Sequence, residues 1–526
     1  MNKFLIKGKV WTGEPSSPYA QAFFTENDKI TKVGSVEDVE KYAAGMEYEE
    51  QDFKDNLIIP GISDAHIHAT AYAKQDLYLD LSGVTKLEDI IPIIEQKATE
   101  LPEDQWIRAM NFNEANWAVP IKPDLKFMDS LNVKNPVLIS RYCGHFHAVN
   151  SRGLKESGLW DKQDVNIPRN DDGSPKGQLT EGAAGEIIET ISSIYEKPDN
   201  ISALVEKACI KLASMGITMV HACDAPSYAL GEDLAACQRL DEKDALPIRW
   251  ACYHDELPNY QIKSGFGNEK LFVAGFKIFA DGTLGGRTCA MREDFSDDPG
   301  NKGLLNHSDE EMAALLKEAQ KRGVQVQIHT IGDKALEQTI NSIKAVIAEL
   351  GEPALPYRIN HAIVCPADLL AKIKEINAVV DIQPIQAYTD RNMTPLRVGD
   401  ERMKTCYSFK NLYDTIEIVT GSSDGPMENP NPWLGIWTAV NLTEQDNSPL
   451  KHYNRSQRLS LDEALSIYTV NPWKALGKGD SYGKIAEHYK ADFTVIAGDP
   501  FAIDPKDLFK VTHKATFVDG ELIWKA

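Results

Sequence analysis

The 526-residue sequence lacks several features that would assign it to a specialised class of protein. No stretch approaches the roughly 18 continuous apolar residues of a membrane-spanning helix, and the opening residues 1–8 lack the apolar segment of a signal peptide. No run is rich in Lys or Arg, and the formal net charge of −22 repels nucleic-acid phosphates and anionic membranes. We therefore expect a cytoplasmic protein that binds neither nucleic acids nor membranes.

The sequence also lacks a C-x-x-C pair, although it contains eight cysteines. Several of these cysteines lie inside apolar runs, where a reduced thiol behaves as a small core residue. This distribution predicts buried thiols and indicates neither a cysteine nucleophile nor a zinc-finger site. Histidine is therefore the more informative residue type. The cysteines are Cys143, Cys209, Cys223, Cys237, Cys252, Cys289, Cys365 and Cys406.

Short apolar, β-branched runs alternate with helical patterns through most of the chain, which is typical of βα units around a parallel sheet. Eight such runs are present, and eight strands close a (β/α)₈ barrel. A doubly wound open sheet is the structural alternative, but no G-x-G-x-x-G follows an early strand to support it. The runs are Leu57–Asp64, Gly216–Cys223, Ile248–His254, Leu271–Phe279, Val324–His329, Tyr357–His361, Ala378–Ile382 and Glu417–Ser422.

The predicted fold class is α/β: a TIM-like (β/α)₈ barrel over residues 57–479, with an insertion after its first strand. The insertion, at about residues 72–200, is too long for a plain βα connection, and we expect it to cover one mouth of the barrel and select substrates. Both chain ends contain strand-like runs but too few for two separate sheets. Residues 1–56 and 480–526 are therefore predicted to form one small β-sandwich.

Polar side chains lie in or after five of the predicted strands, at the end of the barrel where TIM-barrel chemistry collects. Alternation places His66 and His68 on one side of their strand, where two imidazoles can bind one metal ion. Each residue alone has an ordinary structural explanation, but their joint occurrence favours a site. The set comprises His66 and His68 after the first strand, Lys277 in the fourth, His329 ending the fifth, His361 ending the sixth and Asp424 after the eighth.

Five segments resemble motifs of the amidohydrolase superfamily, and most closely those of its amidohydrolase 3 branch, which contains N-substituted formamide deformylases. The segments are Pro60–His68, Gly144–Asn150, Lys277–Thr288, His329–Ala335 and Arg358–Ala362. The resemblance covers nearly the whole chain. It implies a metal-dependent amidohydrolase that hydrolyses a non-peptide C–N bond of a small amide, N-substituted formamide or cyclic amide through a metal-bound hydroxide.

The resemblance also implies a binuclear metal site. Reaction with CO₂ converts a lysine amine into an anionic carbamate that can bridge two metal ions, which explains Lys277 in an apolar strand. The ligand set would be His66 and His68 on one divalent ion, His329 and His361 on the other, the carbamate of Lys277 between them, and Asp424 beside the hydroxide. These ligands suit Zn²⁺, with Fe, Mn and Ni as alternatives. Asp424 is also the predicted catalytic proton acceptor and donor.

Two alternatives to this scheme remain. A mononuclear, deaminase-like site would use His66, His68, His329 and Asp424, but no glutamate stands beside His329 or His361 as the expected proton shuttle. A non-enzymatic barrel scaffold has no reason to retain six polar groups that cost stability when buried without metal.

Four further residues match motifs of the branch and are candidates for substrate binding: His145, Asn150, Asp281 and Arg287. His145 and Asn150 lie in the insertion, whereas Asp281 and Arg287 follow Lys277 and could shape the loop over the metals. The expected partner is a small-molecule substrate, and a homo-oligomer is left open.

Overall fold

The computed structural model describes residues 3–114, 117–141, 146–195, 197–224, 230–254, 257, 262–446 and 448–526. The chain divides into two compact units. One comprises Met1–Tyr72 with Val205–Ala526, and it contains the barrel and the paired chain ends. The other, Ala73–Leu204, is an insertion after the first barrel strand.

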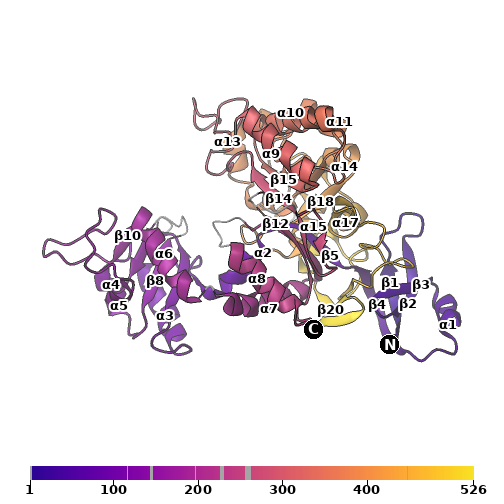
Figure 1. Ribbon diagram of the computed structural model, residues 1–526, viewed down its shortest axis with the longest axis horizontal. Coiled ribbons are helices and arrows are strands. Elements are labelled where there is room, and N and C mark those ends of the chain that lie inside the picture. Colours follow the sequence, from indigo (N-terminus) through magenta and orange to yellow (C-terminus); the bar gives the residue numbers. More distant parts are fainter. Residues whose placement is uncertain are drawn as a thin grey trace. The chain divides into compact units, whose positions relative to one another are not determined.

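A parallel sheet of eight strands forms the centre of the first unit (Figure 1). Its strand order follows the chain order from β5 to β18 without reversal, whereas a doubly wound sheet reverses at a switch point. The predicted TIM-like barrel is therefore confirmed over the open sheet. The strands are β5 (Ile62–Ile67), β11 (Ile217–Ala222), β12 (Arg249–His254), β14 (Leu271–Phe279), β15 (Gln325–Thr330), β16 (Arg358–His361), β17 (Val379–Ile382) and β18 (Val419–Gly421).

The barrel is nearly closed where β5 and the segment after β18 meet. The backbone N–H of Asp424 donates to the carbonyl of His66 at 2.8 Å, and that of His68 donates to the carbonyl of Gly425 at 2.7 Å. Residues that follow the first and last strands therefore lie side by side at the carboxyl end of the barrel, where the predicted ligands were expected to converge.

The first predicted strand, Leu57–Asp64, is divided between two sheets. β4 (Glu49–Pro60) belongs to the sheet of the chain ends, and β5 begins at Ile62. At Gly61, between them, the N–H donates to the Asp492 carbonyl at 2.9 Å, and a Cβ would lie 2.2 Å from Thr218 Oγ1. The unbroken apolar run could not indicate this change of sheet, because both halves are buried.

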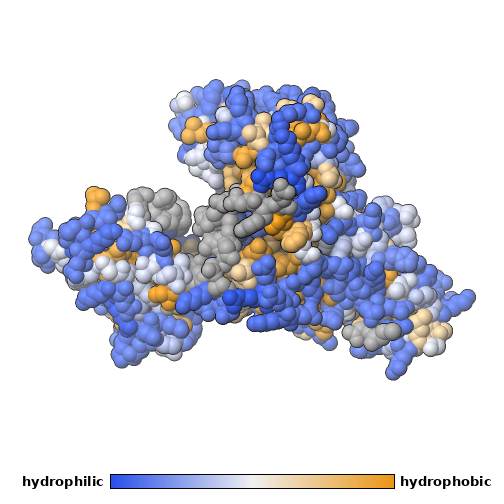
Figure 2. Space-filling view, in the orientation of Figure 1, coloured by the Kyte–Doolittle hydropathy of each residue, from blue (hydrophilic) through white to orange (hydrophobic). Residues whose placement is uncertain are grey.

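Helices and a few short strands connect the barrel strands. On the face shown in Figure 2, hydrophilic residues cover most of the surface over α9 and α10. No helix within the described ranges is long and apolar enough to cross a membrane. The elements are α2 (Ala69–Lys74), α7 (Pro198–Ala213), α8 (Leu230–Asp241), β13 (Phe266–Gly267), α9 (Asp309–Arg322), α10 (Asp333–Leu350), α11 (Ala367–Glu375), α12 (Pro384–Thr389), α13 (Thr394–Met403), α14 (Phe409–Thr415), α15 (Pro432–Asn441), α16 (Leu461–Tyr468) and α17 (Val470–Ala475).

Strands from both chain ends pair in one seven-stranded sheet, in the order β21-β20-β19-β4-β1-β2-β3. Strands from the N-terminal and C-terminal parts of the chain share one core, in which Phe23 contacts Phe493 with ring centroids 5.0 Å apart. The two termini therefore fold together, in a single continuous sheet. The elements are β1 (Lys3–Trp11), β2 (Tyr19–Glu26), β3 (Lys29–Gly34), α1 (Val36–Ala43), β19 (Phe493–Ile496), β20 (His513–Val518) and β21 (Glu521–Lys525).

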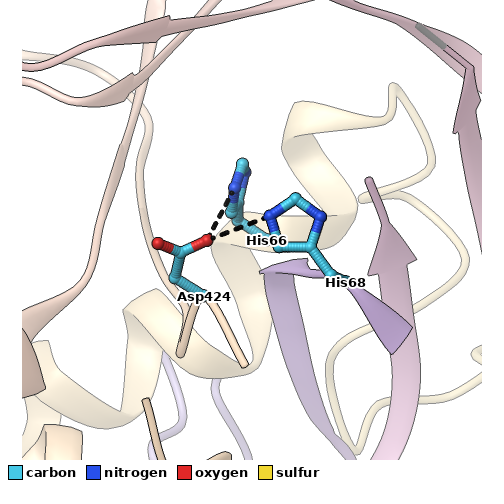
Figure 3. A group of neighbouring side chains, drawn as sticks. All are labelled: His66, His68 and Asp424. Atoms are coloured by element: carbon cyan, nitrogen blue, oxygen red, sulfur yellow. Dashed lines mark ion pairs between the residues drawn. The ribbon is translucent and has the colours of Figure 1, made fainter. Parts of the chain in front are cut away.

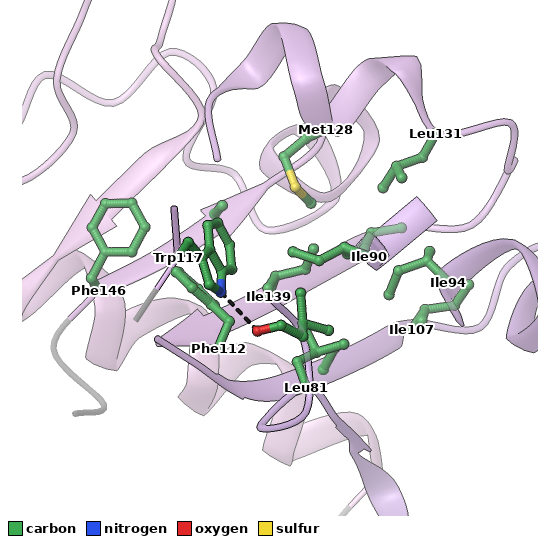
Figure 4. Close-up of a cluster of buried hydrophobic side chains, with 14 residues drawn as sticks. Leu81, Ile90, Ile94, Ile107, Phe112, Trp117, Met128, Leu131, Ile139 and Phe146 are labelled. Atoms are coloured by element: carbon green, nitrogen blue, oxygen red, sulfur yellow. Dashed lines mark hydrogen bonds between the residues drawn. The ribbon is translucent and has the colours of Figure 1, made fainter. Parts of the chain in front are cut away.

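The insertion has its own five-stranded sheet and its own core. Ile107, Ile139 and Phe112 of this core are fully or almost fully buried, and Trp117 donates its Nε1–H to the Val84 carbonyl at 2.8 Å (Figure 4). The elements are β6 (Leu79–Asp80), α3 (Ile90–Ala98), β7 (Ile107–Phe112), α4 (Leu125–Ser130), β8 (Val137–Arg141), β9 (Phe146–Val149), α5 (Ser151–Glu156), β10 (Gln178–Thr180) and α6 (Glu181–Tyr195).

The cysteines behave as the sequence predicts. The seven within the described residues are all buried and form no disulfide with one another, and Cys143 lies outside them. Burial raises the pKa of Cys223 to about 12, so this thiol stays protonated and is not a nucleophile.

Candidate metal centre

Two histidines of the first barrel strand converge on the carboxylate that follows the last. His66 Nε2 and His68 Nε2 lie 3.2 Å and 3.4 Å from Asp424 Oδ1 (Figure 3). The ligand atoms of these three buried residues all lie within 4.8 Å of one another. Two imidazoles and a carboxylate at this spacing can hold a divalent cation of the Zn²⁺ type.

Asp64 joins the two segments that form this group. Its Oδ1 accepts the backbone N–H of His66 at 3.2 Å and that of Ser423 at 3.0 Å, and its Oδ2 accepts the Ser423 hydroxyl at 2.5 Å. This buried carboxylate therefore fixes the end of β5 against the loop after β18, which places His66 and His68 next to Asp424.

His329 and His361 form a second pair, with ring centroids 4.5 Å apart. His329 Nε2 lies 2.9 Å from the Gly282 carbonyl oxygen, to which it can only donate, so Nδ1 has the lone pair. His361 Nδ1 lies 2.8 Å from Gln383 Oε1, and its Nε2 is buried without a hydrogen-bond partner in the described part of the chain. A buried lone pair without a donor costs free energy unless a cation binds it, so this pair also fits a metal ion.

Lys277 lies among these histidines. Its side chain is 1% exposed, and Nζ donates to Asn360 Oδ1 at 2.5 Å. Within the described residues, no carboxylate lies within ion-pairing distance of Nζ. Burial consequently lowers the pKa of Lys277 to about 8, which favours the neutral amine that a reaction with CO₂ requires.

The charge states suit metal binding. Burial lowers the pKa of His66 to about 4 and that of His329 to about 3, so both imidazoles are neutral at pH 7. Burial alone would raise the pKa of Asp424, but hydrogen bonds with His66 and His68 outweigh it and hold this carboxyl well below its usual range. Neutral imidazoles and an ionised carboxylate are the forms that coordinate divalent ions.

Two of the predicted ligands adopt a left-handed backbone conformation, with φ of 73° at His361 and 63° at Asp424. Such angles are uncommon for residues other than glycine and concentrate at functional sites. In this protein the two left-handed residues turn the chain at the end of β16 and after β18. The side chains of His361 and Asp424 thereby face the other proposed ligands.

The four predicted substrate-binding residues have different outcomes. His145 lies outside the described residues. Asn150 caps helix α5 by accepting the N–H of Gly153 at 2.9 Å and also accepts that of Val137 at 3.0 Å. Substrate binding by Asn150 stays a prediction, and these contacts favour a structural role in the insertion.

Asp281 and Arg287 both hold loops of the first unit. The Asp281 carboxylate accepts the backbone N–H groups of Ala290, Ile331 and Gly332 at 2.8–3.1 Å, which ties the loop after β14 to the loop after His329. Arg287 pairs with Asp297 at 2.8 Å. Direct contact of either with substrate stays a prediction, while shaping of the loop near the site is supported by these bonds.

Sequence reasoning missed four polar residues around the site: Asp64, Asn360, Gln383 and Gln386. Gln386 Nε2 donates to Asp424 Oδ2 at 3.2 Å, so it orients the oxygen that does not face the histidines. Asn360 and Asp64 directly precede or closely precede predicted ligands, and Gln383 and Gln386 follow the seventh predicted strand. Their position at the ends of predicted strands was the one feature of the sequence that could have identified them as residues of the site.

Comparisons with known proteins show the family of this chain. Residues 49–524 match the model of the amidohydrolase family. The chain is 30% identical over 532 residues to a Bacillus subtilis (strain 168) protein named "Putative amidohydrolase YtcJ", with 98% of each chain covered. It is 24% identical to an N-substituted formamide deformylase of Arthrobacter pascens, with 98% of this chain and 97% of the relative covered.

A solved structure shares the fold. An uncharacterized metal-dependent hydrolase from Pyrococcus horikoshii superposes with a TM-score of 0.81 at 24% identity. The match covers 96% of this chain and 99% of that structure.

Proposed function

The chain belongs to the amidohydrolase family and is a hydrolase of carbon–nitrogen bonds other than peptide bonds, and from this premise we propose a specific reaction and site. The proposed reaction is metal-dependent hydrolysis of a small amide, N-substituted formamide or cyclic amide. The observation that supports it best is the convergence of His66, His68 and Asp424 beside the unsatisfied Nε2 of His361.

The site would hold two divalent ions, which we propose to be Zn²⁺. His66 and His68 would hold one ion and His329 and His361 the other, with the carbamate of Lys277 between them and Asp424 as a further ligand. When bound, such ions lower the pKa of water and polarise a substrate carbonyl. The buried amine of Lys277 supports the carbamate, because within the described residues no carboxylate lies at ion-pairing distance to keep it protonated.

Asp424 is the proposed proton carrier. Its carboxylate is ionised and accepts hydrogen bonds on both oxygens, from the two histidines and from Gln386. It would accept a proton as water attacks the carbonyl carbon and then deliver that proton to the leaving nitrogen. Gln386 would keep the carboxylate in one orientation through both transfers.

A one-metal, deaminase-like site is the second candidate. The compact spacing of His66, His68 and Asp424, a group that includes neither His329 nor His361, is the observation that favours a single ion. The stoichiometry of bound metal separates the two candidates: two ions per chain support the carbamate-bridged site, and one ion supports the alternative.

The proposed substrate class rests on the hydrolysis of carbon–nitrogen bonds and on the name of one relative. The name of the Arthrobacter pascens relative supports N-substituted formamides as the first compounds to test. We propose a small-molecule substrate and a cytoplasmic location, and the insertion is the proposed source of selectivity. Assembly into a homo-oligomer would not change this chemistry, because all six proposed ligands belong to one unit.

The test combines elemental analysis with a substrate screen. Purified protein is assayed for Zn, Fe, Mn and Ni, and then for hydrolysis of N-substituted formamides, N-acyl amines, cyclic imides, carbamates and esters. Bound metal and activity on a C–N substrate are expected. A protein that stays metal-free and inactive on every compound after reconstitution with Zn²⁺ and bicarbonate would instead support a binding scaffold.

A further inference from the structure

The hydrogen-bond partner of Lys277 is unusual for a buried lysine. Nζ contacts a neutral amide oxygen, Asn360 Oδ1, at 2.5 Å, and it lies 5.3 Å from the centre of the Phe279 ring. An ammonium has three hydrogens to place, whereas a carbamate nitrogen retains only one. Within the described residues, Asn360 Oδ1 is the one hydrogen-bond acceptor of Lys277 Nζ, and a single acceptor matches the modified side chain better than the ammonium.

Asn360 cannot turn its amide the other way. Its Nδ2 donates to Asp381 Oδ2 at 2.5 Å, and an ionised carboxylate only accepts hydrogen bonds. Asp381 is itself fixed, because Arg358 donates to both of its oxygens, at 2.7 Å and 3.0 Å, and the Thr420 hydroxyl donates to Oδ1. With its NH₂ group held by Asp381, Asn360 must present its oxygen to Lys277.

The backbone around Asn360 is equally rigid. It lies on β16, where it pairs with His329 of β15 and with Asp381 of β17. Its side chain, like those of Arg358 and Asp381, is completely buried. The acceptor oxygen is therefore preorganised on β16, next to His361 in the chain and opposite His329 of β15.

We propose that Asn360 is the positioning residue for the Lys277 carbamate: its Oδ1 accepts the one remaining N–H and thereby sets the plane of the two carbamate oxygens. This inference rests on the carbamate in the proposed function. The neutral amine's lone pair forms a bond to the carbon of CO₂, one C=O electron pair moves to oxygen, and one N–H proton leaves to solvent. The resulting C–N bond has partial double-bond character, so the N–H direction fixes the carbamate plane.

The test measures the carbamate directly. Full-length protein is loaded with Zn²⁺ and ¹³C-bicarbonate, and the carbamate carbon is followed by ¹³C NMR at increasing bicarbonate concentration. The variants are Asn360→Leu, which has the same number and branching of side-chain heavy atoms, and Asn360→Ser, which is smaller and polar in case the first fails to fold. Thr420→Val is the matched control, because it removes another donor to Asp381 without touching Lys277.

We expect both Asn360 variants to need about tenfold or more bicarbonate for half-maximal carbamate signal, because a buried donor loses its acceptor. Thr420→Val should match the unsubstituted protein. Equal signals in all four proteins, or an equal loss in Thr420→Val, would overturn the role of Asn360 while leaving the carbamate intact. No carbamate signal in the unsubstituted protein would overturn the carbamate itself, and with it this inference.

Discussion

Lys277 and Lys490 are both buried lysines, 1% and 6% exposed, but their surroundings differ completely. Lys490 lies in a group of carboxylates, with Asp28 at 2.5 Å, Glu269 in contact and Asp519 at 3.6 Å. Burial lowers its pKa, but these carboxylates outweigh burial and raise it above the usual value. Burial lowers the pKa of Lys277 to about 8, because the attraction of Asp424 and Asp381, which lie beyond ion-pairing distance, is too weak to offset it.

This difference shows that ligand spacing alone does not identify a metal site. Asp28, Glu269 and Asp519 have spacing suitable for a cation, as do His66, His68 and Asp424. The carboxylate group already has its cation in Lys490. The group of His66, His68 and Asp424 lies beside Lys277, which has no ion pair within the described residues, and beside the unsatisfied Nε2 of His361. Charge balance separates a structural cluster from a candidate functional one.

The largest expected effect comes from Lys277→Met. Loss of the carbamate should lower kcat/KM by about 10³-fold or more and reduce bound metal from two ions to one or none, because metal activation of water is lost. Steady-state kinetics and elemental analysis measure both quantities. Full activity with two bound ions would remove Lys277 from the mechanism.

The matched substitution Lys490→Met should affect stability and leave the site intact. It leaves Asp28 and Glu269 without this cation, whereas Asp519 keeps its ion pair with Arg249, and since these carboxylates are partly exposed, we expect a loss of about 1–3 kcal/mol in the free energy of unfolding. Urea denaturation measures this loss, and metal content per folded chain should not change. If Lys490→Met instead lost bound metal and kept its stability, Lys490 would be the lysine of the metal site and not a structural residue.

Buried histidines extend the comparison. His513 has both nitrogens engaged, by Thr494 Oγ1 at 2.8 Å and Trp433 Nε1 at 2.9 Å, and burial lowers its pKa to about 3. Because the unfolded chain binds this proton near pH 6.5 and the folded chain only near pH 3, its contribution to stability is present above pH 6.5 and is lost as pH falls through this window.

Substitution tests this pH dependence. His513→Gln should make the decline of unfolding free energy between about pH 6.5 and pH 4 shallower, by at most about 1.4 kcal/mol per pH unit. Denaturation curves at several pH values measure the slope, and metal content serves as the control. An unchanged slope would mean that His513 does not bind this proton on unfolding.

The smallest expected effect is that of Gln386→Leu. Loss of one hydrogen bond to Asp424 Oδ2 should lower kcat by about three- to tenfold while metal content and stability stay nearly unchanged. Gln338→Leu is a control on another helix, because Gln338 donates to Asp309 and not to the site. An equal decrease of kcat in both variants would argue against a specific role for Gln386.

The sequence predicted most of the barrel because its strands are short, apolar and β-branched. The predicted run Leu271–Phe279 coincides with β14, and the run Val324–His329 differs from β15 by one residue at each end. The division at Gly61 was not predictable, because it depends on contacts with Asp492 and Thr218 from distant parts of the chain.

Within the candidate site, only residues of types that commonly bind metal ions or transfer protons could be predicted from the sequence. His66, His68 and Asp424 converge as expected, since strand ends in a barrel lie at one edge. Asn360 and Gln386 were missed because amides occur everywhere in proteins, and only the fold places them beside Lys277 and Asp424.

A crystal structure of the protein loaded with Zn²⁺ and bicarbonate, with anomalous scattering at the zinc edge, tests the central claim most directly. The account predicts two zinc peaks, at about 2.0–2.1 Å from the nitrogens of His66 and His68 and of His329 and His361 respectively, with carbamate density on Lys277. A single peak beside an unmodified Lys277 amine, or no peak, would contradict it.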